Sequence, residues 1–378
     1  MISFMQIQKS NTSLLSNLNQ KTLLRGLLIG LIAYIGAIFF AVIFFGTIIY
    51  HKYQRFLAAA ELSHTDVVNL VKQLTSPNDS NNNTNSTFLI LGLDDVANRP
   101  NAPQLSDTML LVGVNKNSNQ ITLLNMPRDI WSDAYKTKIN TLYEYGKDRY
   151  PASPQQFPQE VMQELAKIKI DQSLVIYLAD LKKLIDIVGG VTINVEAGFI
   201  DEQFPRDDVD LTTETDPAVL YETIKFNTGV QTMNGETALK YIRSRHSFNE
   251  TEGDDIARSK RQQQVFQALL KKLSQPGLYW QQPEIGGLLL KFYQDRVEQY
   301  FPIQQALSLA VKLVRNEKEI TVNNLALPIY PDDPNGVIEH PKNLKPFDNQ
   351  WVYIIRNHKS FQEFIHSHFD SDNSSALN

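Results

Sequence analysis

The stretch Asp107–Ile130, "DTMLLVGVNKNSNQITLLNMPRDI", contains two apolar runs joined by a short polar segment. Runs of this length, rich in aliphatic residues and bounded by polar ones, are typical of buried strands. The segment "NKNSN" between Thr108–Val114 and Gln120–Met126 is typical of a turn. We therefore predict a β-hairpin here, as part of a central sheet.

Charged residues stand at the ends of this hairpin and of the strand before it. Asp107 precedes the first hairpin strand, and Arg128 and Asp129 follow the second. The preceding apolar run, "FLILGL", predicts another buried strand and is followed directly by two acids. Because sites in α/β sheets are commonly built from strand ends and their loops, we interpret these residues as site candidates. Ordinary loop polarity is the alternative explanation.

Helix and strand patterns alternate in the rest of the chain. "SPQQFPQEVMQELAKIKI" has helical spacing of its apolar residues, and "SLVIYLADLKKLIDIVGGVTINV" predicts a strand, a helix and a strand. Asp180 is a candidate N-cap for the helix Leu181–Val188, and Gly189 and Gly190 would end that helix. These patterns predict an α/β domain with a mixed central β-sheet flanked by helices.

A second group of charged residues lies in Tyr241–Gln264, "YIRSRHSFNETEGDDIARSKRQQQ". Its later part begins a long predicted helix whose apolar stripe starts at Val265. A favourable interaction with the helix dipole is enough to explain Asp254 and Asp255 at the start of this helix. Arg258, Arg261 and Gln262 are spaced i, i+3 and i+4, so they share a face on the first turns. Because arginine suits bidentate contacts with phosphate, a phosphate-binding face is one interpretation, and a solvated helix face is the other.

The segment 26–50 contains no charged side chain. About 20 apolar residues cross a bilayer as a helix, so we predict a transmembrane span, with a cleaved signal peptide as the less favoured alternative. The short segment before the span and the long segment after it favour a single-pass cell-membrane protein with a cytoplasmic N-terminus. The predicted divisions are a cytoplasmic tail at 1–25, the span at 26–50, a stalk and Asn-rich linker at 51–86, an extracytoplasmic domain at 87–368 and a disordered tail at 369–378.

The composition excludes several classes of site. The chain has 378 residues and a formal charge of -5, and this acidic balance argues against broad nucleic-acid binding, so we expect no nucleic-acid partner. Cysteine is absent, which excludes disulfides, a thiolate nucleophile and cysteine-based metal sites. The 7 histidines show no metal-ligand spacing, so we interpret them as surface or structural residues.

In order along the chain, the pieces "LGLDD", "LSDTMLLVGVN", "ITLLNMPRDIW", "KIN", "MNGETALKYIRSR" and "GDDIARSKRQQQV" resemble the LytR–CpsA–Psr (LCP) family of bacterial cell-envelope proteins. The similarity covers roughly residues 88–273. It implies an LCP-like sandwich with an apolar tunnel for a lipid. It also implies a membrane-anchored, Mg²⁺-dependent phosphotransferase. Such an enzyme moves a glycopolymer from a polyprenyl (undecaprenyl) pyrophosphate carrier to peptidoglycan or another wall glycan.

Carried over by motif, the resemblance also implies a metal pair and a set of pyrophosphate-binding side chains. Asp94, with its neighbour Asp95 as the alternative, and Asp107 resemble the ligands of Mg²⁺, or of Mn²⁺ in its place. The candidates for catalysis and pyrophosphate binding are Arg128, Arg243, Arg245, Arg258 and Gln262, with Lys138 of "KIN" as a further source of positive charge. The arginines would neutralise the pyrophosphate while a sugar hydroxyl of the acceptor attacks. Two acids, Asp129 and Asp254, are candidates for the general base.

The sequence departs from the family pattern at one position of this set. Many members have arginine directly before "SDT", where this chain has Leu105, and Arg99 in the preceding loop is an alternative source of that charge. Two other functions also stay open, and Leu105 favours the second of them. One is a polyprenyl-pyrophosphate hydrolase that uses water as the nucleophile. The other is a non-catalytic lipid- or glycan-binding regulator.

Overall fold

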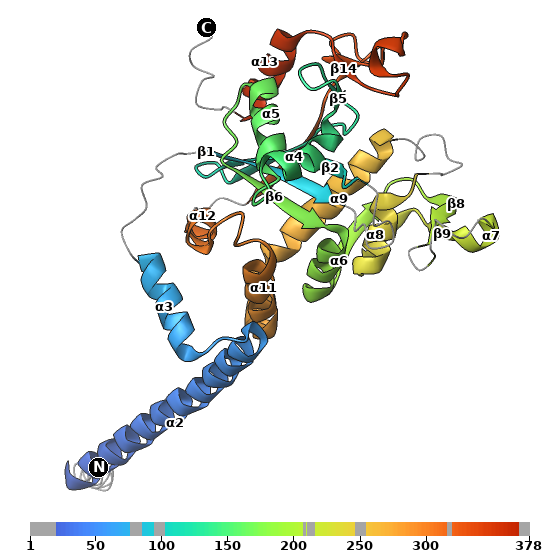
Figure 1. Cartoon of the computed structure of the whole chain (residues 1–378). Coiled ribbons are helices and arrows are strands. Elements are labelled where there is room, and N and C mark those ends of the chain that lie inside the picture. Colours follow the sequence, from blue (N-terminus) through green and yellow to red (C-terminus); the bar gives the residue numbers. More distant parts are fainter. Residues whose placement is uncertain are drawn as a thin grey trace, which may run out of the picture.

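A computed structural model of the protein describes residues 20–75, 85–93, 103–206, 209, 216–245, 255–315 and 320–369. In this part of the chain, helices cover both faces of a central β-sheet, and one long helix projects away from the domain (Figure 1). The predicted α/β class with a mixed central sheet is confirmed.

The central sheet has five strands in the order β11-β3-β2-β1-β6. These strands are β1 (Asn85–Leu93), β2 (Ser106–Asn115), β3 (Gln120–Asn125), β6 (Gln172–Tyr177) and β11 (Thr321–Ala326). β2 is antiparallel to both β1 and β3, so the predicted hairpin is confirmed as β2–β3. β6 joins β1, and β11 joins β3, in parallel. The carboxyl ends of β1, β3, β6 and β11 consequently lie at one edge of the sheet, beside the start of β2.

The alternation of side chains along the strands divides the core into two apolar layers. One face of the sheet is covered by α4 (Leu142–Arg149), α5 (Gln156–Ala166) and α13 (His358–Phe369), and the other by α9 (Asp255–Leu273) and α12 (Ile303–Arg315). Leu89, Leu91 and Leu93 pack in the first layer. Leu110 and Leu123 pack in the second. Both faces of the strands are therefore buried, which explains why the strand sequences are nearly continuous apolar runs.

A further core lies beside the sheet, against the other side of α9. It is built from α6 (Leu178–Ile187), β7 (Val191–Val195), β8 (Phe199–Pro205), β9 (Tyr221–Phe226), β10 (Gly229–Met233) and α8 (Gly235–Arg243), with the short helix α7 (Pro217–Leu220) before β9. Gly189 and Gly190 have φ angles of 77° and 90° and end α6 as predicted. The prediction that Asp180 caps α6 is wrong. The N-cap is Tyr177, and the buried Asp180 carboxylate lies 3.1 Å from Arg296 Nε.

The last part of the chain returns to the segment that follows β3. It forms a small sheet of β12 (Ile329–Tyr330), β13 (Ile338–Glu339) and β14 (Ile354–Ile355). The segment that follows β3 contains a separate pair of short strands, β4 (Trp131–Ser132) and β5 (Thr137–Lys138). Tyr353 N–H donates to Asp129 O at 2.9 Å, and Trp131 N–H donates to Tyr353 O at 2.8 Å. Two segments far apart in the sequence are thereby joined by backbone hydrogen bonds.

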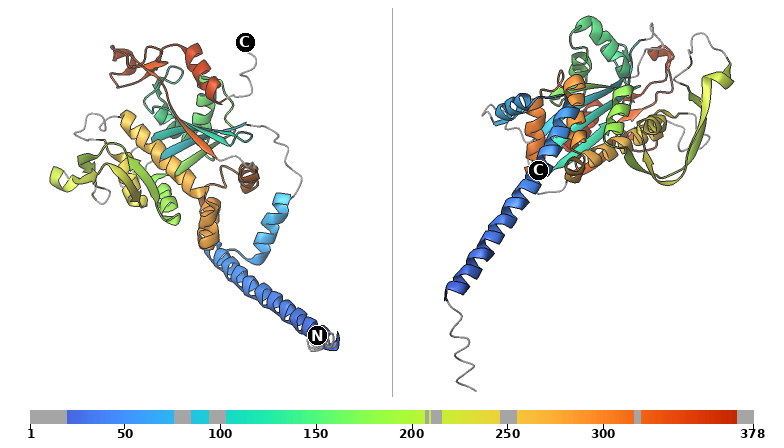
Figure 2. Two further views of the ribbon diagram at one scale, coloured as in Figure 1. Left: turned by 180° about the vertical axis from the view of Figure 1, so that it is seen from behind. Right: turned by 90° about the horizontal axis from the view of Figure 1, so that it is seen from below.

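Helix α2 (Gln20–Ala60) is 41 residues long and contains the predicted span. Its segment Leu28–Ala60 is long and apolar enough to cross a membrane. Figures 1 and 2 show this helix projecting from the domain, on the side away from α13. The helix does not end at Tyr50, where we predicted the end of the span. It continues into the predicted stalk before the chain turns at Glu61 and enters α3 (His64–Thr75).

The last turns of α2 pack against α11 (Pro283–Arg296), which follows the short helix α10 (Pro276–Gln281). Gly287 permits this contact, because a Cβ atom there would lie 2.4 Å from Phe56 O. Arg55 Nη2 lies 2.5 Å from the Glu284 carboxylate, and Lys52 Nζ lies 4.6 Å from the centroid of the Trp280 ring. The beginning of the predicted stalk is therefore a docked part of the domain.

Candidate functional site

The candidate site lies at the sheet edge where β1, β3 and β11 end and β2 begins. Leu93, the last residue of β1, pairs with Ser106, the first residue of β2. Ala326 at the end of β11 pairs with Asn125 at the end of β3. The ladder thus holds the last residues of β1 and β3 next to the start of β2, which carries Asp107.

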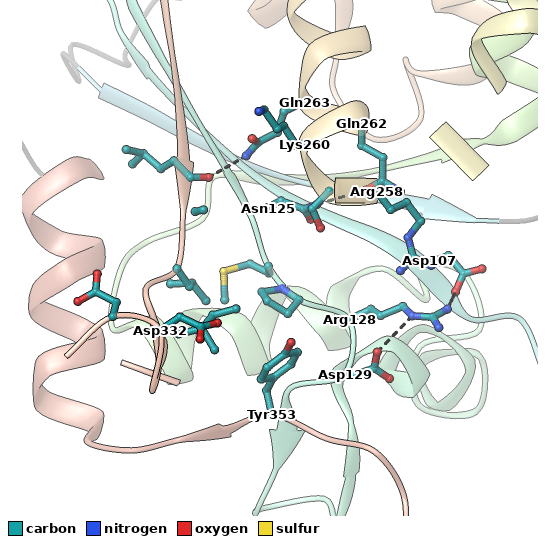
Figure 3. Close-up of a pocket in the computed structure, with 18 residues that line it drawn as sticks. Asp107, Asn125, Arg128, Asp129, Arg258, Lys260, Gln262, Gln263, Asp332 and Tyr353 are labelled. Atoms are coloured by element: carbon teal, nitrogen blue, oxygen red, sulfur yellow. Dashed lines mark hydrogen bonds and ion pairs between the residues drawn. The ribbon is translucent and has the colours of Figure 1, made fainter. Parts of the chain in front are cut away.

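A cavity of about 400 Å³ opens at this edge, a volume typical of small-molecule sites (Figure 3). Its polar lining comes from five separate parts of the chain, namely Asp107, Asn125, Arg128, Asp129, Arg258, Ser259, Lys260, Gln262, Gln263, Asp332, Asp333 and Tyr353. Five predicted site residues, Asp107, Arg128, Asp129, Arg258 and Gln262, are among them. The structure therefore brings together the two charged segments that the sequence separates.

Arg128 stands at the centre of an ion-pair network in the cavity wall. Its guanidinium contacts the Asp107 carboxylate through Nη1, and its Nε lies 3.4 Å from one oxygen of Asp129. Lys138 Nζ lies 2.7 Å from the other Asp129 oxygen. Asp129 is 5% exposed, and a carboxylate this deeply buried needs such cationic partners. Its contacts favour a role in positioning Arg128 and Lys138 over the predicted role as a general base.

Helix α9 supplies Arg258 and Gln262 to the cavity. Gln262 Oε1 accepts a hydrogen bond from Asn125 Nδ2 at 3.2 Å, and Gln263 Nε2 donates to Leu325 O at 2.7 Å. These bonds tie the first turns of α9 to β3 and β11. Arg258 is buried, and its side chain extends towards Asp107 and Arg128 (Figure 3). Two guanidinium groups from different elements therefore lie on one cavity wall, which favours binding of an anion with more than one charge.

Arg261 is different, although its spacing predicts the same face as Arg258. It is 1% exposed, and it donates from Nε to Tyr241 O at 2.9 Å and from Nη2 to Ser244 O at 2.6 Å. Its guanidinium also lies 4.8 Å from the centroid of the Phe199 ring. Arg261 thus holds the end of α8 against α9 and is a structural residue.

The described residues that line the cavity do not include Arg243 or Arg245. The Arg243 guanidinium lies 5.4 Å from the centroid of the Phe204 ring, and the Arg245 side chain is exposed. The buried Asp201 accepts hydrogen bonds from Ser244 Oγ at 2.7 Å and from Arg245 N–H at 3.1 Å, and Ser244 lies between the two arginines in the sequence. Asp201, which the sequence analysis did not single out, therefore fixes the segment that carries both arginines beside α9.

Several predicted residues fall outside the part of the chain that the structure describes: Asp94, Asp95, Arg99 and Asp254. Leu105 is half-buried in the segment before β2. Within the described ranges, His, Asp and Glu side chains form no group of three or more that could hold a metal. Asp107 is thus the predicted metal ligand whose surroundings are known.

The sequence analysis missed Asn125, Asp332, Asp333 and Tyr353 as cavity residues. Asn125 directly precedes "MPRD", and that position was its only signal. The two acids of "PDDPNG" look like ordinary turn residues, and Asp333 Oδ1 indeed accepts a hydrogen bond from Asn335 N–H at 2.8 Å. Tyr353 has no local signal, because its place depends on a bridge to Ile130.

A family profile, LytR_cpsA_psr, matches residues 50–345. Among similar proteins, Biofilm regulatory protein A of Streptococcus mutans is 31% identical over 174 residues, which are 44% of this chain and 38% of that protein. The polyisoprenyl-teichoic acid–peptidoglycan teichoic acid transferase TagV of Bacillus subtilis is 28% identical over 195 residues, which are 50% of this chain and 44% of that protein. The chain thus spans less than half the length of these two relatives. Regulatory protein MsrR of Staphylococcus aureus is 25% identical over 279 residues, 72% of this chain and 74% of that protein.

Solved structures show a similar fold. The crystal structure of TagV from B. subtilis has a TM-score of 0.52 and 20% sequence identity, covering 76% of this chain and 98% of that one. A structure of TagT bound to LIIa-WTA has a TM-score of 0.50 and 17% identity, covering 76% and 91%. At these identities, the comparisons establish the fold and leave the chemistry to be argued from the site.

Proposed function

The chain belongs to the LytR_cpsA_psr family, and on that premise we propose that it is a membrane-anchored glycopolymer transferase. Its donor would be a glycan on a polyprenyl pyrophosphate carrier, and its acceptor peptidoglycan or another wall glycan. The observation that carries this proposal is the meeting of Arg128 and Arg258 on one cavity wall beside Asp107. Several relatives are named as transferases of teichoic acid from a polyisoprenyl carrier to peptidoglycan, which supports the same substrate class.

The chemistry follows from the charge of a pyrophosphate. Cleavage of its anhydride bond requires that the negative charges be neutralised while an oxygen nucleophile approaches in line. Arg128 and Arg258 would each donate paired N–H groups to phosphate oxygens, which is the geometry that a guanidinium provides. The acceptor hydroxyl would form the new bond to phosphorus, and polyprenyl phosphate would leave. Asp129 would keep Arg128 in place through its 3.4 Å contact.

Asp107 fits a divalent cation site at the same wall. Its side chain is 47% exposed at the cavity, and a hard cation such as Mg²⁺ commonly combines one or two carboxylates with phosphate oxygens and water. A bound Mg²⁺ or Mn²⁺ would supply further charge neutralisation at the pyrophosphate. Asn140 Oδ1 is a buried oxygen without a hydrogen-bond partner among the described residues, and Asn140 N–H donates to Arg128 O at 3.2 Å. We propose this amide oxygen as a second candidate ligand of the cation, in the segment whose backbone bonds to Arg128.

The lipid part of the donor requires an apolar surface that reaches the membrane. The lipid tunnel stays a prediction of the family resemblance, because the apolar layer between the sheet and helices α9 and α12 is a packed core in the described residues. The docking of α2 on α11 ties the domain to the helix that would cross the bilayer. Because the proposed acceptor is a wall glycan, we propose that the N-terminus lies in the cytoplasm and the cavity outside the membrane.

One experiment separates this function from its alternatives. The full-length protein in lipid nanodiscs is incubated with a polyprenyl-pyrophosphate-linked glycan, with Mg²⁺ or with EDTA, and with or without a peptidoglycan oligomer. We expect Mg²⁺-dependent release of polyprenyl phosphate together with glycan on the oligomer. Release without transfer would indicate a hydrolase. Tight carrier binding without release would indicate the regulator that Leu105 favours, since a family arginine is missing there.

A further inference from the structure

We propose that Tyr353, Trp351, His340 and Asp332 form a saccharide-binding surface at the opening of the cavity. It rests on the proposed function, because it gives a place to the glycan of the donor or of the acceptor. Trp351 and Tyr353 lie beyond residues 50–345, the part that the family profile matches. The argument for this surface therefore comes from the geometry of this chain.

The three aromatic side chains form a continuous row that starts inside the cavity. Tyr353 lines the cavity. The Trp351 ring meets it edge to face, with centroids 6.4 Å apart and an interplanar angle of 82°. Val352 between them is fully buried, and the contact between the two rings shows that Trp351 and Tyr353 lie on the same side of this segment. The His340 ring stacks on Trp351 with centroids 3.5 Å apart, and its Nδ1 lies 2.9 Å from Val352 O.

This row is held in position and yet open to solvent. Trp351 is 52% exposed, and since His340 covers one face of its indole, the exposure belongs to the other face and the edge. A single exposed aromatic residue is ordinary on a protein surface. Trp351 differs because its ring is fixed by two other rings and leads directly into the cavity. Aromatic rings that are already fixed lose little conformational entropy of their own when a ligand binds.

The chemistry of the surface fits a sugar ring. One face of a pyranose presents C–H groups, which are apolar and slightly positive, whereas the face of an aromatic ring is negative. Asp332 also lines the cavity and is exposed, and a carboxylate accepts hydrogen bonds from sugar hydroxyls. Figure 3 shows Asp332 and Tyr353 on the side of the cavity away from Arg258. Negative charge there disfavours phosphate, so the cavity has a cationic side for the pyrophosphate and an aromatic, acidic side for the glycan.

The test measures saccharide binding directly, without a lipid or a reaction. The full-length protein in nanodiscs is titrated calorimetrically with an N-acetylglucosamine tetramer, as an acceptor-like glycan. In a second arm it is titrated with the carrier-free glycan 1-phosphate, as a donor-like glycan. Wild type is compared with Trp351→Ala, Trp351→Phe and the control Trp280→Ala, which removes a tryptophan of similar exposure from α10, beside the stalk. Thermal melts verify that each variant is folded.

We expect Trp351→Ala to weaken binding of one of the two glycans about tenfold, Trp351→Phe to weaken it less, and Trp280→Ala to leave it unchanged. The affected arm identifies the source of the glycan. Equal affinity in wild type and Trp351→Ala, or no saccharide binding by wild type at millimolar concentration, would overturn the proposal.

A second readout needs no Trp351 variant. In Trp280→Phe, the saccharide should protect Trp351 from acrylamide quenching, because the remaining Trp131 is buried. Saccharide binding without any release of polyprenyl phosphate would keep this proposal and remove the proposed transferase function.

Discussion

Arg258 and Arg261 lie one helical turn apart on α9, and both are buried, yet their surroundings differ in kind. Arg258 lines the cavity with Arg128 and Asp107. Arg261 donates to two backbone carbonyls at the end of α8 and lies over an aromatic ring. Both satisfy the same motif spacing in the sequence. The spacing in the sequence predicts a polar helix face. Packing of that face against other elements determines which of the two arginines lines the cavity.

The largest effect should come from Arg258. Replacement by alanine removes a bidentate donor from the cavity wall, and loss of such a donor costs about 3–4 kcal/mol of transition-state stabilisation. We expect release of polyprenyl phosphate to slow by about 100- to 1000-fold, with the melting temperature nearly unchanged. The matched control is Lys271→Ala on the exposed part of the same helix, which should keep wild-type turnover. Equal loss in both variants would show that α9 matters only as a scaffold.

An effect of comparable size should come from Arg261, and it should be a loss of stability instead of turnover. Arg261→Ala leaves two buried carbonyls without their charged donor, which costs about 3–5 kcal/mol of unfolding free energy. Arg261→Lys keeps the positive charge but lacks the planar guanidinium with its several N–H donors, so it should recover only part of the lost unfolding free energy. Chemical denaturation of the detergent-solubilised protein measures both. A stable Arg261→Ala with low turnover would reverse the assignment of the two arginines.

Asp129 lies between these cases, because it touches both the site and the interior. Asp129→Asn keeps the shape but leaves Lys138 without this negative partner and Arg128 with the Asp107 carboxylate, so we expect a loss of about 1–3 kcal/mol in stability. Turnover should also fall, since Arg128 loses its second anchor. The pH profile of turnover distinguishes the roles. Loss of a positioning residue lowers the turnover rate at every pH. Loss of a general base removes the fall in turnover on the acidic side of the pH profile.

The smallest effect concerns Glu144, which supports the segment before Asp107. Burial acts to raise the pKa of Glu144, but hydrogen bonds from Lys147 and from Gln104 N–H lower it below its ordinary value of 4.5. A lowered carboxyl pKa contributes stability above the unfolded pKa and loses it as pH falls through the folded pKa. Because the group is partly exposed, its share should be below about 1 kcal/mol. Glu144→Gln should therefore match wild type only at a pH below the lowered pKa of Glu144 and be slightly less stable at pH 7 in denaturation experiments.

Local pattern was enough to predict the hairpin of Asp107–Ile130 and the end of α6 at Gly189, because apolar runs and positive φ are properties of neighbouring residues. The same patterns failed at Asp180, whose carboxylate pairs with Arg296 from a distant helix. They also gave no sign that the start of the stalk docks on α11, a contact that Gly287 permits. Motif resemblance found Asp107, Arg128 and Arg258 for the cavity. Asp332 and Tyr353 escaped it because only the return of the last segment to β3 brings them there.

The measurement that tests the central claim most directly is carrier binding to the two cavity arginines. Full-length wild type, Arg128→Ala/Arg258→Ala and Arg261→Lys are titrated with a polyprenyl pyrophosphate and with the corresponding monophosphate. The account predicts that the double variant loses affinity for the pyrophosphate by about 100-fold or more, and for the monophosphate by less, whereas Arg261→Lys binds both like wild type. Unchanged pyrophosphate affinity in a folded double variant would contradict the account.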